Sequence, residues 1–147
     1  MNEHGQKAMV SQNRNVQYFK EPTYLLPVTY AQAATYLKQM GYEVYWDDGN
    51  AQLKTFDQWF NDLAKESPDV VVLESTTPVM KFYWKTIDRI KHALPNCIVI
   101  MTGYHSMRKP NETMEQCNAD IVLRSSHIDF ALHRLIPFID ENDNWRS

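Results

Sequence analysis

The chain has 147 residues, of which 44% are hydrophobic and 22% are charged, and its formal net charge is −3. This length fits one ordinary globular domain with a real core. The negative charge and the lack of a basic stripe argue against a nucleic-acid-binding protein. No apolar run approaches the ~20 residues needed to span a bilayer, and the N-terminal sequence lacks the apolar core of a signal peptide. We therefore expect a cytoplasmic protein that binds neither membranes nor nucleic acids.

Familiar catalytic and metal-binding motifs do not occur in the sequence. It contains no P-loop, no GxGxxG after its first predicted strand, no GxSxG elbow and no HExxH. Cys97 and Cys117 make neither a disulfide framework nor a CxxC site, and the histidines lack metal-ligand spacing. The acidic residues are not placed as in a response-regulator receiver, so phosphotransfer is not expected. No metal site and no catalytic residue is predicted.

The N-terminal third of the chain predicts two strands and a helix. Lys7 to Gln12 is a weak first strand, and Asn13 to Thr23, which is polar and aromatic, is predicted as a loop. A helical pattern begins at Pro27, and Gly41 supplies its C-terminal stop. Tyr42 to Trp46 is rich in strand-forming residues and predicts a strand near a sheet edge.

A turn and a second helix precede the clearest strand of the sequence. Asp47-Asp48-Gly49 is predicted as a turn. Thr55 to Lys65 is predicted as a helix with a Thr55/Gln58 capping box, and its aromatic residues, Phe56, Trp59 and Phe60, are expected in the core. Residues Val70 to Glu74 are almost wholly apolar and mostly β-branched, which is typical of a strand buried on both faces of a parallel sheet.

Three consecutive hydroxyl residues follow this strand, and they are the first candidates for a binding site. They are Ser75, Thr76 and Thr77, and Pro78 then opens a helical pattern. Thr77 is expected to be the N-cap of that helix, with Pro78 in its first turn. Because open α/β sheets bind ligands at the carboxyl ends of their strands, these hydroxyls predict a ligand site.

The remaining sequence continues the alternation of strands and helices. The helix after Pro78 ends at Pro95, and Cys97 to Met101 predicts another buried strand. Pro110 to Gln116 is a possible short helix, and Asp120 to Leu123 is the last strand. Ser126 and Asp129 are expected to cap a final helix, after which the chain is acidic and polar.

About five strands that alternate with helices predict an α/β three-layer sandwich. Short right-handed crossovers favour a flavodoxin-like (Rossmann-like) parallel sheet with the strand order 2-1-3-4-5. The domain is expected to span residues 1–139, and residues 140–147 are expected to be a polar tail or the start of a linker. The loops at the carboxyl edge are rich in small, hydroxyl and aromatic residues, which suits a large neutral ligand better than a reaction.

Four segments resemble the cobalamin-binding domain at the N-terminus of cobalamin-dependent radical SAM (Fe-S oxidoreductase-like) enzymes. They are Leu26 to Asp48, Pro68 to Pro78, Leu94 to Thr113 and Ala119 to Ser126. In that family they correspond to the helix after strand 1, the strand-3 hydroxyl turn, a Gly-Gly-x-His-like turn after strand 4, and the segment before a Gly-Glu-like turn. The resemblance covers Tyr24 to Ile136.

The resemblance implies a cobalamin-binding module, the N-terminal part of a larger radical SAM methyltransferase or cyclase. A 4Fe-4S cluster and S-adenosylmethionine would belong to a downstream radical SAM domain that this sequence lacks, a partner in cis or in trans. The loop from Asn13 to Phe19 would face the lower side of the corrin. By position, the resemblance implies that Ser75, Thr76 and Thr77 line the slot for the nucleotide tail of cobalamin. Gly103 would let the backbone approach the tail, with Tyr104 and His105 beside it. Ser125, in the turn after the last strand, is the remaining residue implied to bind cobalamin.

Several departures from the family pattern bear on this expectation. Thr102-Gly103 replaces the paired glycines and predicts a narrower slot, and Arg124-Ser125-Ser126 replaces the glycine-acid turn. The CxxxCxxC cluster motif is absent, so we expect no catalytic activity from the chain alone. No Asp-x-His is present, so ligation of cobalt by a histidine from that motif is not expected.

Several of these site residues also have a purely structural interpretation. Ser75 to Thr77 could be only a helix cap, Gly103 could serve a left-handed turn, and His105 could be a surface or loop histidine. Glu74 could be a buried acid, to which no role is assigned. The alternative function is a degenerate flavodoxin-like domain that has no cofactor and serves interaction or regulation.

Overall fold

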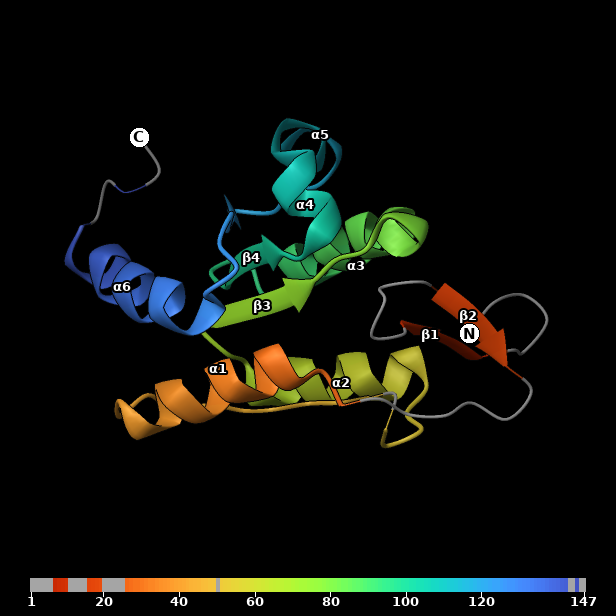
Figure 1. Ribbon diagram of the computed structural model, residues 1–147, viewed down its shortest axis with the longest axis horizontal. Coiled ribbons are helices and arrows are strands. Elements are labelled where there is room, and N and C mark those ends of the chain that lie inside the picture. Colours follow the sequence, from red (N-terminus) through yellow and green to blue (C-terminus); the bar gives the residue numbers. More distant parts are fainter. Residues whose placement is uncertain (1–6, 11–15, 20–25, 50, 143–144, 146–147) are drawn as a thin grey trace. The chain divides into compact units, whose positions relative to one another are not determined.

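Figure 1 shows the computed structural model of the chain, which describes residues 7–10, 16–19, 26–49, 51–142 and 145. The fold is mixed α/β. By its internal contacts the chain divides into two compact units, one made of Met1–Leu25 and Asp48–Arg124 and the other of Leu26–Asp47 and Ser125–Ser147. The first unit contains the parallel sheet and all but one of the predicted site residues.

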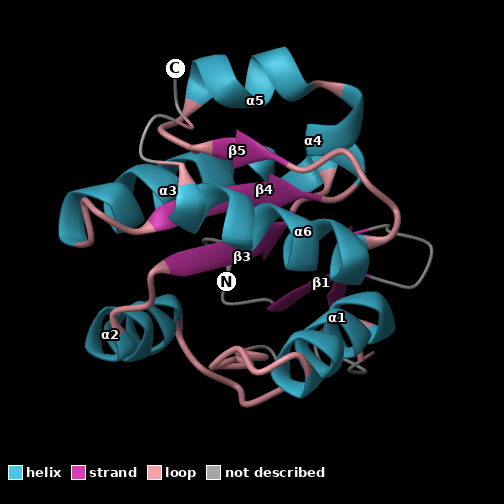
Figure 2. Ribbon diagram, turned by 90° about the vertical axis from the view of Figure 1, so that its left-hand side faces the viewer, coloured by secondary structure: helices cyan, strands magenta, loops and turns pink. Residues whose placement is uncertain are grey.

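The sheet of the first unit consists of three parallel strands in the order β3-β4-β5 (Figure 2). These strands are β3 (Val70–Glu74), β4 (Ile98–Thr102) and β5 (Ile121–Val122). The register pairs Val70 with Ile98 and Glu74 with Thr102, so β3 and β4 end at the same level. The α/β class and the last three predicted strands are thereby confirmed.

The hydrophobic core of this unit lies between one face of the sheet and helices α2 (Phe56–Glu66) and α3 (Met80–Ala93). Its largest fully buried members from α3 are Met80, Ile87 and Ile90. Burying each such side chain stabilises the fold by about 1.5–3 kcal/mol. The Thr55/Gln58 capping box forms as predicted, and the Phe56, Trp59 and Phe60 side chains all belong to the core.

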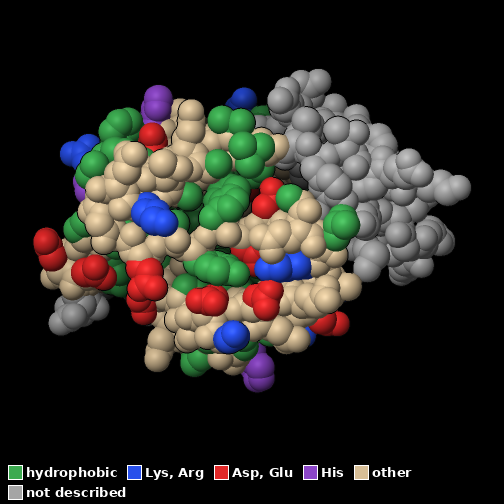
Figure 3. Space-filling model, turned by 90° about the horizontal axis from the view of Figure 1, so that it is seen from below, with side chains coloured by type: hydrophobic (Ala, Val, Ile, Leu, Met, Phe, Trp, Pro, Cys, Tyr) green, Lys and Arg blue, Asp and Glu red, His purple; other side chains and the backbone are tan. Residues whose placement is uncertain are grey.

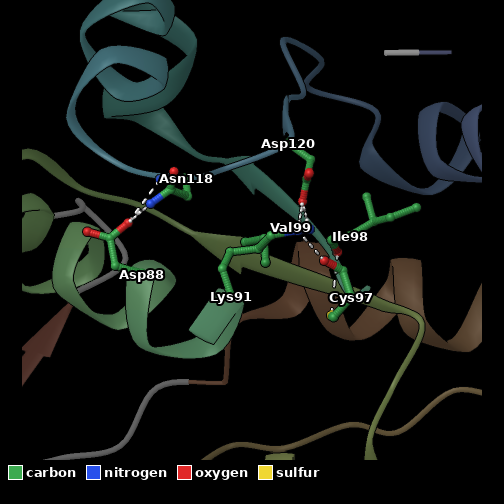
Figure 4. Close-up of polar contacts among 7 residues, drawn as sticks. All are labelled: Asp88, Lys91, Cys97, Ile98, Val99, Asn118 and Asp120. Carbon is green, nitrogen blue, oxygen red and sulfur yellow. Dashed lines mark hydrogen bonds and ion pairs between the residues drawn. The ribbon is translucent and has the colours of Figure 1, made fainter. Parts of the chain in front are cut away.

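Side-chain hydrogen bonds fix the short strand β5 beside β4 (Figure 4). Lys91 Nζ donates to the Cys97 carbonyl at 2.7 Å and to Asp120 Oδ2 at 2.9 Å, and the same carboxylate oxygen accepts the Val99 amide at 2.8 Å. Next to this group, Asp88 accepts both the backbone and the side-chain N–H of Asn118, at 3.0 and 2.8 Å. These side chains therefore connect α3, β4 and the segment that enters β5.

Three short helical segments follow the carboxyl ends of the strands. The 3₁₀ turn η1 (Thr77–Val79) leads from β3 into α3, and α4 (Tyr104–Arg108) begins directly after β4 (Figure 1). Helix α5 (Pro110–Gln116), which the sequence predicted, then leads to β5. Helix α4 was not predicted from the sequence.

The second unit pairs helix α1 (Val28–Gln39) with helix α6 (Ile128–Glu141). The Tyr36 ring contacts Phe130 and His133, with ring centroids 5.2 and 5.6 Å apart. Gly41 ends α1 with φ +94°, as its position in the sequence predicted.

The predictions for the N-terminal strands were wrong in two respects. Strand β1 (Lys7–Val10) pairs antiparallel with β2 (Val16–Phe19), which lies inside the predicted loop Asn13 to Thr23. Val16, Tyr18 and Phe19 are strand formers, and a short connection permits an antiparallel pair but not the crossover that a parallel pair requires. The first strand is thus not shown as a central strand of the parallel sheet.

The predicted strand from Tyr42 to Trp46 does not pair with any strand of the described residues. Strand-forming side chains give an extended backbone, but a strand also needs a neighbour that can exchange hydrogen bonds with it. Five parallel strands and the order 2-1-3-4-5 are therefore not shown, and only the 3-4-5 part of that order is present.

Two helix caps also differ from prediction. Thr77 is the first residue of η1, and the cap position belongs to Thr76, whose side chain makes no capping hydrogen bond. The cap position of α6 belongs to His127 instead of Ser126. The Thr77 hydroxyl bonds to His105 instead of capping its helix, and the Ser125 hydroxyl accepts the His127 amide. Residue propensity alone does not predict such side-chain bonds.

Two properties of the described residues bear on the surface. No helix combines the length and the apolar character needed to cross a membrane. On the face of the molecule shown in Figure 3, basic side chains are scattered among acidic and hydrophobic ones and form no continuous stripe.

The structure predicts that Asp120→Ala is strongly destabilising. The change removes the acceptor of the Val99 amide and leaves the Lys91 ammonium, whose side chain is only 17% exposed, without its carboxylate. We expect a loss of about 2–4 kcal/mol in the free energy of unfolding, measured by urea denaturation. Asp57→Ala is the control, because it removes an exposed carboxylate that pairs with Arg89 at 3.3 Å and should cost at most about 1 kcal/mol. Equal losses in the two variants would contradict this role of Asp120.

Candidate functional site

The candidate site is formed where β3 and β4 end side by side. Because Glu74 and Thr102 are register partners, the turn of Ser75 to Thr77 lies next to the turn of Gly103 to His105. The parallel register thus brings together two segments that are 28 residues apart in the sequence. Six of the seven predicted site residues are gathered at this edge.

The Ser75 hydroxyl is fully engaged within the protein. It donates to the Thr102 carbonyl at 2.7 Å, and it lies 2.6 Å from the Ser106 hydroxyl and 3.3 Å from the Ser106 amide. Since its single proton goes to the carbonyl, it accepts from both groups of Ser106. The Ser75 amide also donates to the Thr102 carbonyl, at 2.8 Å. Ser75 therefore links the end of β3 to β4 and to α4.

Gly103 is required by a close approach between the two turns. Its φ is +92°, and a Cβ at this position would lie 2.5 Å from the Ser75 carbonyl oxygen and 2.7 Å from the Ser75 nitrogen. Both neighbours are backbone atoms, which cannot move aside as a flexible side chain can. The Ser75 backbone thus occupies the space in which a side chain would stand.

His105 is buried, in contrast to the expected surface or loop position. Its residue exposure is 4%, and Nδ1 lies 3.2 Å from the Thr77 hydroxyl. On the other side of the ring, Nε2 lies 3.9 Å from Glu112 Oε2, and the Trp84 ring stands edge-on with its centroid 6.4 Å away. Burial lowers the pKa of His105 below its usual value, although Glu112 opposes the shift. The imidazole is therefore neutral at pH 7.

Two hydroxyls at this edge are buried and have no hydrogen-bond partner among the described residues. They are Oγ1 of Thr76, a residue 3% exposed, and Oγ1 of Thr102, which is 0% exposed. An unpaired buried hydroxyl costs free energy, about 1–3 kcal/mol. Such groups are therefore candidates for hydrogen bonds to a bound molecule.

The other predicted site residues are less closely connected. Tyr104 is 51% exposed, and its ring lies 5.8 Å from the Arg108 guanidinium carbon. Ser125 belongs to the second unit, where its hydroxyl donates to the His127 carbonyl at 3.2 Å and accepts the His127 amide at 3.1 Å. Of the predicted corrin-facing loop, residues 13–15 lie outside the described residues, and Val16–Phe19 form β2.

The ionisable groups near this edge offer little for acid–base or nucleophilic chemistry. Burial, reinforced by Glu74, raises the pKa of Tyr83 to about 12, so its phenol keeps its proton. Away from this edge, ahead of β4 and β5 in the chain, burial also raises the pKa of the Cys97 and Cys117 thiols, which makes both poor nucleophiles. Within the part of the chain that the structure describes, no group of three His, Cys, Asp or Glu side chains could hold a metal ion.

Four residues of the site were missed by sequence reasoning: Ser106, Glu112, Trp84 and Thr102, which was considered only as a replacement of a glycine. Ser106 follows the predicted Gly-Tyr-His turn directly, so extending the turn into a helix would have found it. Glu112 and Trp84 lie on helices α5 and α3 and carry no local signal that points to His105.

Comparison with known proteins adds no relative. No protein-family model matches the chain, and neither a curated protein nor a solved structure matches it.

Gly103→Ala is expected to lower the free energy of unfolding by about 2–5 kcal/mol. The new Cβ adds a clash with the Ser75 backbone to the strain of a positive φ. Gly41→Ala is a matched control, because Gly41 has φ +94° but no atom within 4 Å of its Cβ position. That variant should lose only about 1–2 kcal/mol, the cost of the backbone strain. Urea denaturation compares the two, and equal losses would show that the contact with Ser75 is not tight.

Proposed function

We propose that the chain is a cobalamin-binding module whose ligand site is the carboxyl edge of β3 and β4. The observation that carries the proposal is the pair of buried, unpaired hydroxyls of Thr76 and Thr102, at the adjoining ends of two paired strands. They lie within the segments in which the sequence resembles the cobalamin-binding domains. A flavodoxin-like arrangement of the whole domain, of which the structure has three parallel strands, is part of this proposal.

The residues present fit the polar part of such a ligand. Thr76 and Thr102 would donate hydrogen bonds to the nucleotide tail, and Thr77, Tyr104 and His105 would line the entrance beside them. A bound cobalamin supplies cobalt-centred methyl-transfer chemistry, whereas this chain binds and orients it.

Ligation of cobalt by His105 is not part of the proposal. Its Nδ1 is engaged with the Thr77 hydroxyl at 3.2 Å and its Nε2 faces the Glu112 carboxylate at 3.9 Å, so both nitrogens are directed at protein groups. Hydroxocobalamin bound to the chain should therefore keep the same absorption spectrum in His105→Ala. A spectral change specific to that variant would contradict this assignment.

Thr76→Val and Thr102→Val test the cobalamin proposal. Each removes a hydroxyl and keeps the side-chain shape, so without ligand the free energy of unfolding should be unchanged or raised. If the hydroxyls bind the ligand, each variant should weaken hydroxocobalamin binding by about 0.5–1.5 kcal/mol, which is roughly 2–10-fold in Kd. Absorbance titration and gel filtration measure the binding, and urea denaturation measures the stability.

Ser75→Ala serves as the control, because its hydroxyl already makes hydrogen bonds in the ligand-free protein. It should lose about 1–3 kcal/mol of stability. A wild-type chain that retains no hydroxocobalamin on gel filtration would rule out the proposed function.

An interaction or regulatory domain without cofactor is the second candidate. The observation that favours it is the closure of the edge at Gly103, where the Ser75 backbone fills the space that a ligand tail would need. If the chain has this function, Thr76→Val and Thr102→Val would be as stable as the wild type or more stable. Neither the wild type nor any variant would retain cobalamin. FMN, titrated in parallel, tests the remaining flavodoxin-type ligand.

The proposed partner is a radical SAM domain, in cis or in trans, that holds a 4Fe-4S cluster and binds S-adenosylmethionine. This chain alone is expected to cleave no S-adenosylmethionine, because it lacks the cysteines of a CxxxCxxC cluster motif. Cleavage of S-adenosylmethionine by the purified chain would contradict that expectation.

A further inference from the structure

The contact between His105 and Thr77 determines which kind of ligand group the site can accept. Their polar atoms, Nδ1 and Oγ1, lie 3.2 Å apart. His105 is buried, whereas Thr77 is exposed. The Thr77 hydroxyl therefore stands between a fixed ring and the surface of the site, and the ring decides whether that hydroxyl donates or accepts.

Glu112 determines which nitrogen of the ring carries the proton. A neutral imidazole has one N–H and one nitrogen lone pair. Nε2 has no hydrogen-bond partner among the described residues, and Glu112 Oε2 lies 3.9 Å from it. A lone pair on Nε2 would face a carboxylate, whereas an N–H at that position is attracted to it. The geometry therefore favours the tautomer with the proton on Nε2.

The other charged group that acts on the ring weakens this preference without reversing it. Lys109 Nζ lies 2.9 Å from the same Glu112 oxygen, so it reduces the field of the carboxylate. The Lys109 side chain is 59% exposed, and water screens its charge. Trp84, which faces the ring from α3, carries no charge.

We infer that His105, held in its Nε2–H form by Glu112, positions the Thr77 hydroxyl as a hydrogen-bond acceptor toward the ligand. Nδ1 then accepts the hydroxyl proton of Thr77, so the lone pairs of Oγ1 are what the site presents. The ligand group at this position must be a donor, such as a primary amide N–H or a hydroxyl. A phosphate oxygen, which only accepts, is disfavoured there.

The identity of the donor rests on the proposed function. Cobalamin carries primary amides around its corrin ring, and these supply N–H donors, whereas the phosphate of its nucleotide tail does not. Thr77 therefore contacts a corrin amide or a ribose hydroxyl of the ligand. This places Thr77 at the entrance of the site, apart from the buried hydroxyls of Thr76 and Thr102.

Acid reverses the polarity of the contact. When His105 is protonated, both nitrogens donate. Thr77 then accepts from Nδ1–H with one of its two lone pairs, and its own proton is free to face the ligand, so the hydroxyl presents one lone pair fewer to a donor group. Binding should be complete above the pKa of His105 and should weaken as the pH falls through it. Burial places that pKa below the usual histidine value.

The tautomer can be measured on the full chain without any ligand. Two-bond ¹H–¹⁵N correlation spectra of the imidazole at pH 7 distinguish a proton on Nε2 from one on Nδ1. We expect the Nε2–H form in the wild type and a shift of the population toward Nδ1–H in Glu112→Gln. Glu115→Gln, which removes an exposed carboxylate from the same helix, is the control and should leave the spectrum unchanged. An Nδ1–H form in the wild type would overturn the inference, whatever the chain binds.

Binding measurements test the ligand class separately. With hydroxocobalamin as the probe, Thr77→Val should weaken binding about 2–10-fold, whereas Thr77→Ser should retain it. The wild-type affinity should fall as the pH is lowered through the pKa of His105, which burial places below the usual histidine value, and Thr77→Val should lose this pH dependence. Cobalamin in which the corrin amides are hydrolysed to carboxylates should bind to the wild type more weakly than unmodified cobalamin does. The two forms of cobalamin should bind to Thr77→Val with the same affinity.

The two measurements separate failure of this inference from failure of the proposed function. A wild type that binds no cobalamin but shows the Nε2–H form would overturn the proposed function and the corrin assignment, and would support the role of His105. Binding that is independent of Thr77 and of pH would overturn the assignment of Thr77 as the acceptor, even if cobalamin binds.

Discussion

The hydrogen bonds from Ser75 to the Thr102 carbonyl are the constraint on which the site depends. They extend the ladder between β3 and β4 by one residue beyond the strands, so the two turns leave the sheet in contact with each other. That contact leaves no room for a Cβ at position 103 and orients α4, whose Ser106 returns to the same hydroxyl. Because α4 begins directly after Gly103, its second residue, His105, lies next to Thr77.

The same closure divides the polar groups of the edge into two sets. Ser75 and Ser106 satisfy each other and serve stability, whereas Thr76 and Thr102 are buried without partners. A protein that needed the edge only for packing would gain stability with valine at both threonine positions. The unpaired hydroxyls therefore connect the structure to the proposed function, because a bound ligand is what would compensate for their burial.

The amino ends of β4 and β5 show how side chains hold the described three-stranded sheet together. Strand β5 has two residues, too few for backbone hydrogen bonds alone to specify its register. Asp120 compensates by accepting from the Val99 amide and from Lys91, so that one carboxylate fixes β5 to both β4 and α3. Stability is thus concentrated where β4 and β5 begin, and the candidate ligand-binding groups lie where β3 and β4 end.

The sequence by itself determined the elements that have strong local signals. The apolar β-branched run of Val70 to Glu74, the capping box at Thr55 and the stop at Gly41 were predicted because propensity and spacing act within a few residues. Only the tertiary structure decided which strands pair and which side chains contact one another. Among the residues that the structure describes, Tyr42 to Trp46 has no partner strand, β1 pairs with β2, and His105 is buried against Thr77 and Glu112. Strand pairing and side-chain contacts join residues far apart in the chain, and no local pattern records which of them meet.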